Sequence, residues 1–101
     1  MSDPGQTRSH IRMRAVIEGR VQGVGFRAFV IQKAQDLEVH GWVRNRWDGS
    51  VEVLAEGERA TLERLLGDLR QGPRSAFVTD VNVEWEPATG EFYAFSVRST
   101  A

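Results

Sequence analysis

Residues 17–27 read IEGRVQGVGFR and contain glycines at positions 19, 23 and 25. Glycines at this density allow positive φ angles and a close approach of the backbone to a ligand, which is typical of a tight loop. Upstream, over residues 11–17, apolar residues alternate with polar ones as in a half-buried strand. Downstream, from Phe26 to about Glu38, apolar residues follow helical spacing. We therefore predict a glycine-rich turn, residues 19–25, between a strand and a helix.

The same two periodicities predict the remaining elements. Strands are expected over residues 41–45, 51–56, 80–86 and 92–98, and a second helix over the leucine stripe Leu62, Leu65, Leu66 and Leu69. Asp48-Gly49 is a hairpin signal between two of these strands. Gly72-Pro73 ends the second helix.

This order of elements, βαββαβ with a short C-terminal strand, predicts an α+β fold of the ferredoxin-like, split βαβ type. Both helices are expected on one face of an antiparallel sheet. In this topology the first strand neighbours the third, and the second strand lies beyond the third. The first two strands therefore point the same way and end at one edge, about 10 Å apart. Hence the glycine loop and Asn45 are expected to meet in space.

Composition bounds the function. The chain has 101 residues, a net charge of −1 and no cysteine, which excludes disulfides, a thiol nucleophile and cysteine-ligated metals. A net charge this close to zero produces no overall positive potential that would attract nucleic acid or an anionic membrane. We predict a disordered N-terminal extension over residues 1–10 and one domain over residues 11–101. With no signal peptide and no membrane span in sight, we expect a cytoplasmic monomer with no nucleic-acid or membrane partner.

The start of the predicted first helix suits an anion. The first N–H groups of a helix have no intrahelical partners, and the helix dipole is positive there. Arg27 adds a cation at this end, which is unfavourable unless an anion binds beside it. The candidate phosphate-binding residues are Arg20, Val21, Gln22, Gly23, Val24, Gly25, Phe26 and Arg27. From spacing alone, a loop that only connects two elements remains the alternative. The loop is neither a P-loop nor a dinucleotide fingerprint, because it lacks their spacing.

Two motifs resemble those of a known family. The run from Gly19 to Arg27 is similar to the acylphosphatase signature G-x-V-Q-G-V-x-F-R, and it fills every defined position. A second acylphosphatase signature, G-[aromatic]-V-[basic]-N-x3-G-x-V-x5-G, is matched by Gly41–Asn45 followed by Gly49, Val51 and Gly57. The resemblance covers about residues 13–98, which is nearly the whole chain.

The resemblance implies an enzyme that hydrolyses small-molecule acyl phosphates without a metal or another cofactor. It implies that Arg27 is the phosphate-binding arginine, that Asn45 positions the water, and that the amides from about Val21 to Arg27 form the phosphate cradle. Inorganic phosphate or sulfate is then an expected ligand. One alternative is a non-catalytic anion-binding module, because acylphosphatase-like domains also occur within larger hydrogenase-maturation proteins. The other is RNA binding on the same frame, which is disfavoured because the aromatic residues near Phe26 fall on a helix.

Other residue types that often carry chemistry have plainer interpretations. His10 and His40 are predicted to be surface histidines, since no nucleophile or carboxylate accompanies them in the sequence. The carboxylates Glu52, Glu56, Glu84 and Glu86 are predicted to lie on solvated strand faces. The tryptophans Trp42, Trp47 and Trp85 are predicted to be packing residues.

Overall fold

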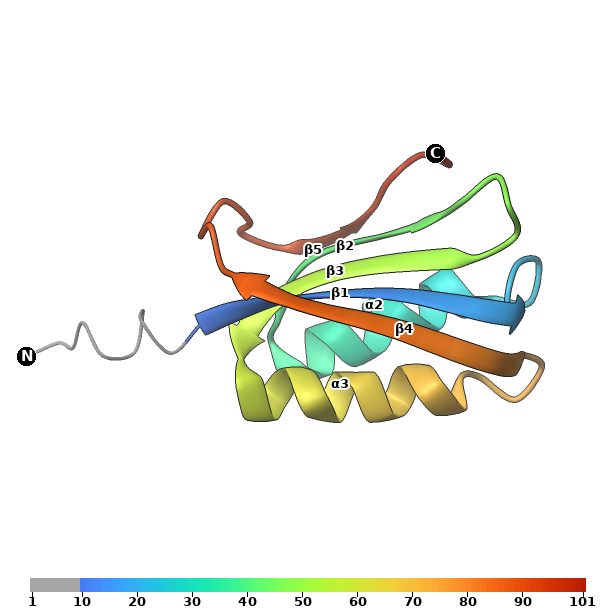
Figure 1. The fold of residues 1–101 in the computed structure, drawn as a ribbon, viewed down its shortest axis with the longest axis horizontal. Helices are drawn as coiled ribbons and strands as arrows, with labels where there is room; N and C mark the ends of the chain where they lie inside the picture. Colours follow the sequence, from blue (N-terminus) through green and yellow to red (C-terminus); the bar gives the residue numbers. More distant parts are fainter. Residues whose placement is uncertain (1–9) are drawn as a thin grey trace, which may run out of the picture.

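A five-stranded sheet with two helices on one face makes up the computed structural model, which describes residues 10–101 (Figure 1). The elements are β1 (His10–Arg20), α2 (Phe26–Leu37), β2 (His40–Asn45), β3 (Val51–Glu58), α3 (Arg59–Gln71), β4 (Phe77–Pro87) and β5 (Phe95–Val97). Every predicted element is present and in the predicted order. The ferredoxin-like α+β prediction is confirmed.

The strand order brings distant parts of the chain together. The sheet runs β4-β1-β3-β2-β5, with β1 antiparallel to both β3 and β4, and β2 antiparallel to β3. Because β1 and β2 both oppose β3, they point the same way, as the topology predicted. The loop after β1 and the turn after β2 consequently lie at one end of the sheet (Figure 1).

The last strand departs from the predicted antiparallel sheet, because β5 pairs parallel with β2. The path of the chain explains the difference. The end of β4, at Pro87, lies opposite Ile11 near the start of β1. The chain then crosses at this same end of the sheet and enters β5 at Phe95, opposite Gly41 near the start of β2. Therefore β5 must run in the direction of β2, and the sheet is mixed.

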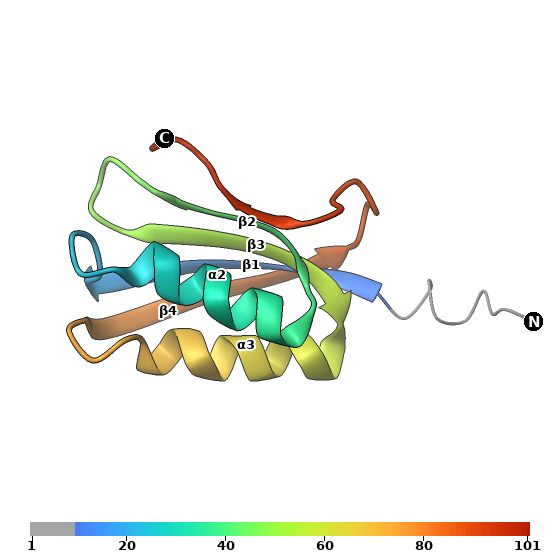
Figure 2. The same ribbon diagram turned by 180° about the vertical axis from the view of Figure 1, so that it is seen from behind.

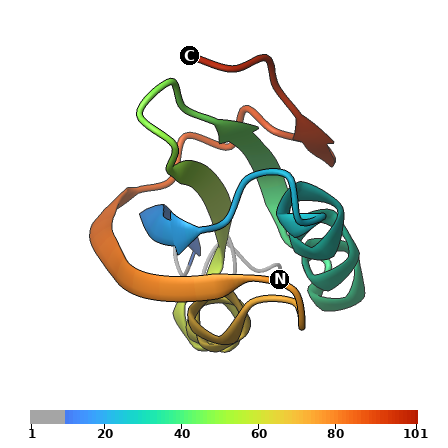
Figure 3. The same ribbon diagram turned by 90° about the vertical axis from the view of Figure 1, so that its right-hand side faces the viewer.

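Both helices cover one face of the sheet (Figures 2 and 3), and the hydrophobic core lies between these two layers. Helix α3 buries its predicted leucine stripe, and α2 buries Phe26, Val30 and Ala34. The strands contribute alternating residues, among them Met13, Ala15, Ile17, Val51, Val53 and Ala55. Each fully buried large aliphatic or aromatic side chain contributes about 1.5–3 kcal/mol to folding. This apolar layer fixes where both ends of the sheet lie relative to α2.

The opposite face of the sheet carries buried carboxylates, and our prediction that they are solvated is wrong for two of them. Only 4% of Glu52 and 7% of Glu56 are exposed. Glu52 accepts hydrogen bonds from Arg14 at 2.7 Å and Arg44 at 2.8 Å, and Glu56 accepts one from Arg12 at 2.9 Å. Cross-strand register is the cause, since Arg12 faces Glu56 and Arg44 faces Glu52. Pairing with arginine makes this burial tolerable.

The tryptophans divide into two groups. Trp42 is buried, with the guanidinium carbons of Arg44 and Arg98 4.6 and 5.1 Å from its ring centroid. Trp85 packs against the core, with Arg59 3.9 Å from its centroid. Trp47 is 82% exposed, so our prediction that it packs is wrong. It lies in the turn after β2, outside both the sheet and the helices.

Two boundaries differ from those predicted. Strand β1 continues past a bulge at Glu18 and Gly19 to Arg20, because the long strand β4 begins early enough to pair with it. The connecting loop therefore begins at Val21 rather than Gly19. At the other end, His10 is the first residue of β1 and pairs with Glu58, so it is not part of the extension. The rest of that extension, residues 1–9, lies outside the described residues.

Candidate active site

The glycine loop leads directly into α2 with its backbone in left-handed conformations. Gly23 and Gly25 have φ angles of 74° and 79°, and a Cβ atom added at either would meet no atom within 4 Å. Conformation rather than lack of space thus requires glycine at both positions. Gly25 is the N-cap of α2, and the first bond of the helix runs from the Phe29 N–H to the Gly25 carbonyl at 3.1 Å. The N–H groups just before Phe29 therefore have no partner within the helix.

Arg27 is an exposed cation in the first turn of α2. No acidic residue lies in that turn, and within residues 10–101 Arg27 forms no ion pair. Arg12, Arg14 and Arg44, by contrast, are all paired with glutamates. A positive charge beside the positive end of the helix dipole gives this part of the surface a strong preference for anions.

Asn45 is the last residue of β2 and pairs with Val51 of β3. Its side-chain Oδ1 is buried and has no hydrogen-bond partner in the described part of the chain. A buried acceptor without a donor costs about 1–3 kcal/mol. Such a cost is typical of a residue kept for function, because stability alone would favour an apolar side chain at this position.

One cleft of ≈ 400 Å³ brings these two residues together. It is lined by Val21, Gly23, Gly25, Phe26, Arg27, Ala28, Ile31, Asn45 and Val97. Arg27 comes from the helix and Asn45 from the sheet, and the strand order places them at the same end of the molecule, as the topology predicted. Of the other predicted loop residues, Gln22 and Val24 lie in the loop without lining the cleft, and Arg20 lies in β1.

The apolar wall of the cleft was not predicted from the sequence. Ala28 and Ile31 come from α2, and Val97 comes from β5 with 47% of its surface exposed. Ile31 stands four positions after Arg27, so helical spacing could have placed it on the same face. Val97 could not have been found this way, because its position depends on the parallel pairing of β5 with β2.

The turn after β2 is braced on several sides. The Arg46 N–H donates to the Ser50 carbonyl at 2.9 Å, and the Asp48 carboxylate accepts from both the N–H and the hydroxyl of Ser50. These bonds from Ser50 hold the pKa of Asp48 below its ordinary value. The Ala101 N–H donates to the Asn45 carbonyl at 3.1 Å. The backbone that carries Asn45 is therefore held in place from the turn and from the end of the chain.

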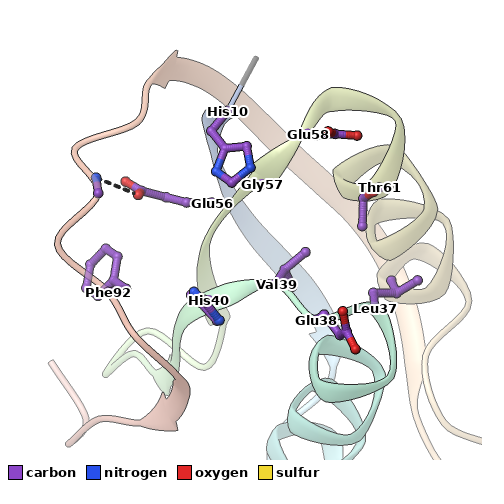
Figure 4. A pocket seen from close by; sticks show the side chains of 11 residues that line it. His10, Leu37, Glu38, Val39, His40, Glu56, Gly57, Glu58, Thr61 and Phe92 are labelled. Carbon is purple, nitrogen blue, oxygen red and sulfur yellow. Dashed lines mark hydrogen bonds between the residues drawn. The ribbon is translucent and has the colours of Figure 1, made fainter. Parts of the chain in front are cut away.

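A second cleft of ≈ 210 Å³ lies at the other end of the sheet (Figure 4). His10 and His40 line it, and both are exposed as predicted. The carboxylate residues Glu38, Glu56 and Glu58 also line it, which disfavours a phosphate dianion. Over residues 10–101, no group of three histidine, aspartate or glutamate side chains is arranged to hold a metal ion. None of the described helices is long and apolar enough to cross a membrane.

The fold and the first cleft place the chain among ferredoxin-like α+β proteins that carry a glycine-rich loop between the first strand and the first helix. The family model for acylphosphatase matches residues 13–97. The chain therefore belongs to the acylphosphatase family, and it is a hydrolase of that class. Membership of this family supports the hydrolysis of acyl phosphates.

Individual relatives agree with this assignment over almost the full chain. An acylphosphatase of Salinibacter ruber is 48% identical over 93 residues, which is 92% of this chain and 98% of the relative. The structure of an acylphosphatase from Coxiella burnetii is 36% identical, with a TM-score of 0.87 over 95% of this chain and all of the other. HypF of T. kodakarensis is 30% identical with a TM-score of 0.75, but the match covers 86% of this chain and only 12% of HypF.

Proposed function

We propose that the cleft beside α2 hydrolyses acyl phosphates to a carboxylate and phosphate. In this proposal Arg27 and the N–H groups from Val21 to Arg27 hold the phosphate, and Asn45 positions the attacking water. The observation that carries it is that Arg27 and Asn45 line one cleft at the open N-terminal end of a helix.

The chemistry of the substrate explains why so few groups suffice. The leaving group is a carboxylate, whose conjugate acid has a pKa of about 4, so it departs without protonation by a general acid. Phosphoryl transfer then depends mainly on positioning and on stabilising charge on the equatorial oxygens. A guanidinium and fixed amide donors supply that stabilisation without reorganisation during the reaction. The Arg27 fork and the loop amides are groups of this kind.

Asn45 contributes orientation rather than basicity. Its amide can accept a hydrogen bond from water or donate one, but it cannot take a full proton at neutral pH. The lining of the cleft, as far as the described residues show it, includes no carboxylate and no imidazole. We therefore propose that the phosphate of the substrate accepts the water proton. The water oxygen bonds to phosphorus, the bond from phosphorus to the acyl oxygen breaks, and the proton ends on the released phosphate.

A non-catalytic anion-binding module is the second candidate. The observation in its favour is that a domain of this fold makes up only 12% of the HypF chain it matches. Such a module would use the same loop and Arg27 to bind phosphate but would not need an aligned water. The two candidates therefore differ in the role of Asn45, which matters for hydrolysis and not for binding.

The test is hydrolysis of benzoyl phosphate in excess chelator by the wild type, Arg27→Ala and Asn45→Ala. Each substitution should lower kcat/KM by about 100-fold or more, because each removes a contact made in the transition state. Two exposed residues outside the cleft provide matched controls, Arg64→Ala on α3 and Asn82→Ala on β4, and both should stay near wild type. A folded wild type that binds inorganic phosphate but hydrolyses nothing would support the binding module instead.

A further inference from the structure

The glycine loop is held in place by few contacts. Val21 and Phe26 anchor its two ends in the core. Between them, Val24 is partly buried and packs against the core, whereas a Cβ atom added at Gly23 or Gly25 would meet open space. Two side chains also hold the loop through hydrogen bonds. The Ser75 hydroxyl donates to the Val24 carbonyl at 3.0 Å, and the Gln22 amide bonds to the turn after β2.

The Gln22 side chain makes two hydrogen bonds to the turn after β2. Its Nε2 donates to the carbonyl of Arg46 and to the carbonyl of Ser50, at 2.8 Å each. These two carbonyls already close the turn, since they accept from the N–H groups of Gly49 and Arg46 respectively. A primary amide uses both of its hydrogens in this arrangement. A carboxylate of the same length has no hydrogen to donate and would face two carbonyl oxygens.

The turn to which Gln22 is hydrogen-bonded begins one residue after Asn45. The side chain therefore ties the loop, which leads to Arg27, to the backbone that carries Asn45. The Gln22 side chain does not line the cleft, and both of its amide hydrogens are directed at the turn after β2. Any effect of this side chain on the reaction must therefore act through the placement of groups that do line the cleft.

We propose that Gln22 is a positioning residue that fixes the phosphate loop relative to Asn45, and so sets the distance between the bound phosphorus and the attacking water. This inference rests on the proposed function. Its energetic ground is that an error of about 1 Å in such a placement can cost about 100-fold in rate. Phosphate affinity should be much less sensitive, because Arg27 and the amides all lie on the loop side of the contact.

The test compares Gln22→Met with the matched control Gln32→Met. Methionine keeps the length of glutamine and removes both donors, and within residues 10–101 the Gln32 side chain makes one exposed hydrogen bond, to Asp36 on α2. With benzoyl phosphate as substrate and inorganic phosphate as competitive inhibitor, Gln22→Met should lower kcat by about 10–100-fold and change the inhibition constant of phosphate less than about threefold. Gln32→Met should change neither. Gln22→Asn, which shortens the side chain by one methylene, provides a milder second variant with the same expected direction.

A double-mutant cycle separates positioning from general loosening. If Gln22 acts through Asn45, then Gln22→Met should cost little kcat in an Asn45→Ala background. Additive losses in the cycle, an unchanged kcat in folded Gln22→Met, or an equal loss of kcat and phosphate affinity would each overturn the inference. An inactive but folded wild type would instead overturn the proposed function, on which the inference rests, and the two failures are thereby distinguishable.

Discussion

Arg27 in the first turn of α2 and Asn45 at the end of β2 line one cleft, although one belongs to the helical layer and the other to the sheet. The first is exposed and cationic, whereas the second buries an acceptor without a partner in residues 10–101. Substitutions at the two positions should accordingly have different consequences for binding, turnover and stability.

Replacing Arg27 by lysine tests whether geometry matters in addition to charge. Lysine keeps the positive charge but lacks the planar fork that matches two phosphate oxygens. We expect kcat/KM for benzoyl phosphate to fall in the order wild type, Arg27→Lys, Arg27→Ala, with the lysine variant about 10-fold or more below wild type. Arg64→Lys on α3 is the control. Equal activity of Arg27→Lys and wild type would show that charge alone suffices.

Replacing Asn45 by valine should abolish most activity while raising stability. The substitution removes a buried acceptor that has no partner and introduces a residue that favours strands. We expect the free energy of unfolding, measured in urea, to rise by about 1 kcal/mol. Asn82→Val, at an exposed position of β4, controls for strand propensity alone. A clear loss of stability in Asn45→Val would mean that the buried amide contributes to the fold.

Two glycines in similarly open surroundings should respond to alanine in opposite directions. Gly25 has a φ angle of 79°, and Gly67 lies within α3 on its exposed side. Gly25→Ala should destabilise by about 1–2 kcal/mol through backbone strain alone, and it should also lower activity by shifting the loop amides. Gly67→Ala should stabilise by up to about 1 kcal/mol through helix propensity. Urea unfolding of both variants checks the pair, and the same sign for both would contradict the assigned conformations.

Glu56 should make stability depend on pH. Burial alone would raise its pKa, but hydrogen bonds from the N–H groups of Thr89 and Gly90 and the contact with Arg12 outweigh burial and lower it. Its contribution is therefore fully present above the ordinary glutamate pKa of about 4.3 and is lost as the pH falls through the lowered value in the folded protein.

Glu56→Gln should consequently be less stable than wild type by about 1.5–3 kcal/mol at pH 7, and this difference should shrink below about pH 4. Urea unfolding at pH 7, 5 and 3.5 measures it. Glu84→Gln, on the exposed side of β4, should show little difference at any pH. A constant gap between wild type and Glu56→Gln across the range would rule out this origin of the pH dependence.

The spacing of apolar residues was sufficient to predict the helices and strands and their order, because the core is built from regular apolar stripes such as the four leucines of α3. The meeting of Arg27 and Asn45 in one cleft could also be predicted, since the order of elements dictates that β1 and β2 end together. The roles assigned to these two residues stay predictions, which the variants above would test.

Features that depend on how the strands pair could not be predicted from the sequence. Glu52 looks like a solvated residue in the sequence, and only the pairing of β2 with β3 reveals Arg44 facing it. The parallel direction of β5 follows from where the chain crosses the sheet, which no local pattern encodes. The pair of hydrogen bonds from the Gln22 side-chain amide to the turn after β2 likewise depends on how two loops approach each other in space.

The pairing of β1 with two strands that come much later in the chain has a consequence for synthesis on the ribosome. Strand β1 lies between β3 and β4, so its two edges stay unpaired until residues 51–58 and 77–87 have emerged. The glycine loop that follows β1 therefore leaves the ribosome before the turn that Gln22 binds, and well before β4 completes the pairing of β1. Contacts between such distant segments slow folding, because long loops must close before they are formed. A nascent chain that stops before β4 would carry every residue of both signature motifs and the strands that bring them together, but one edge of β1 would still be unpaired.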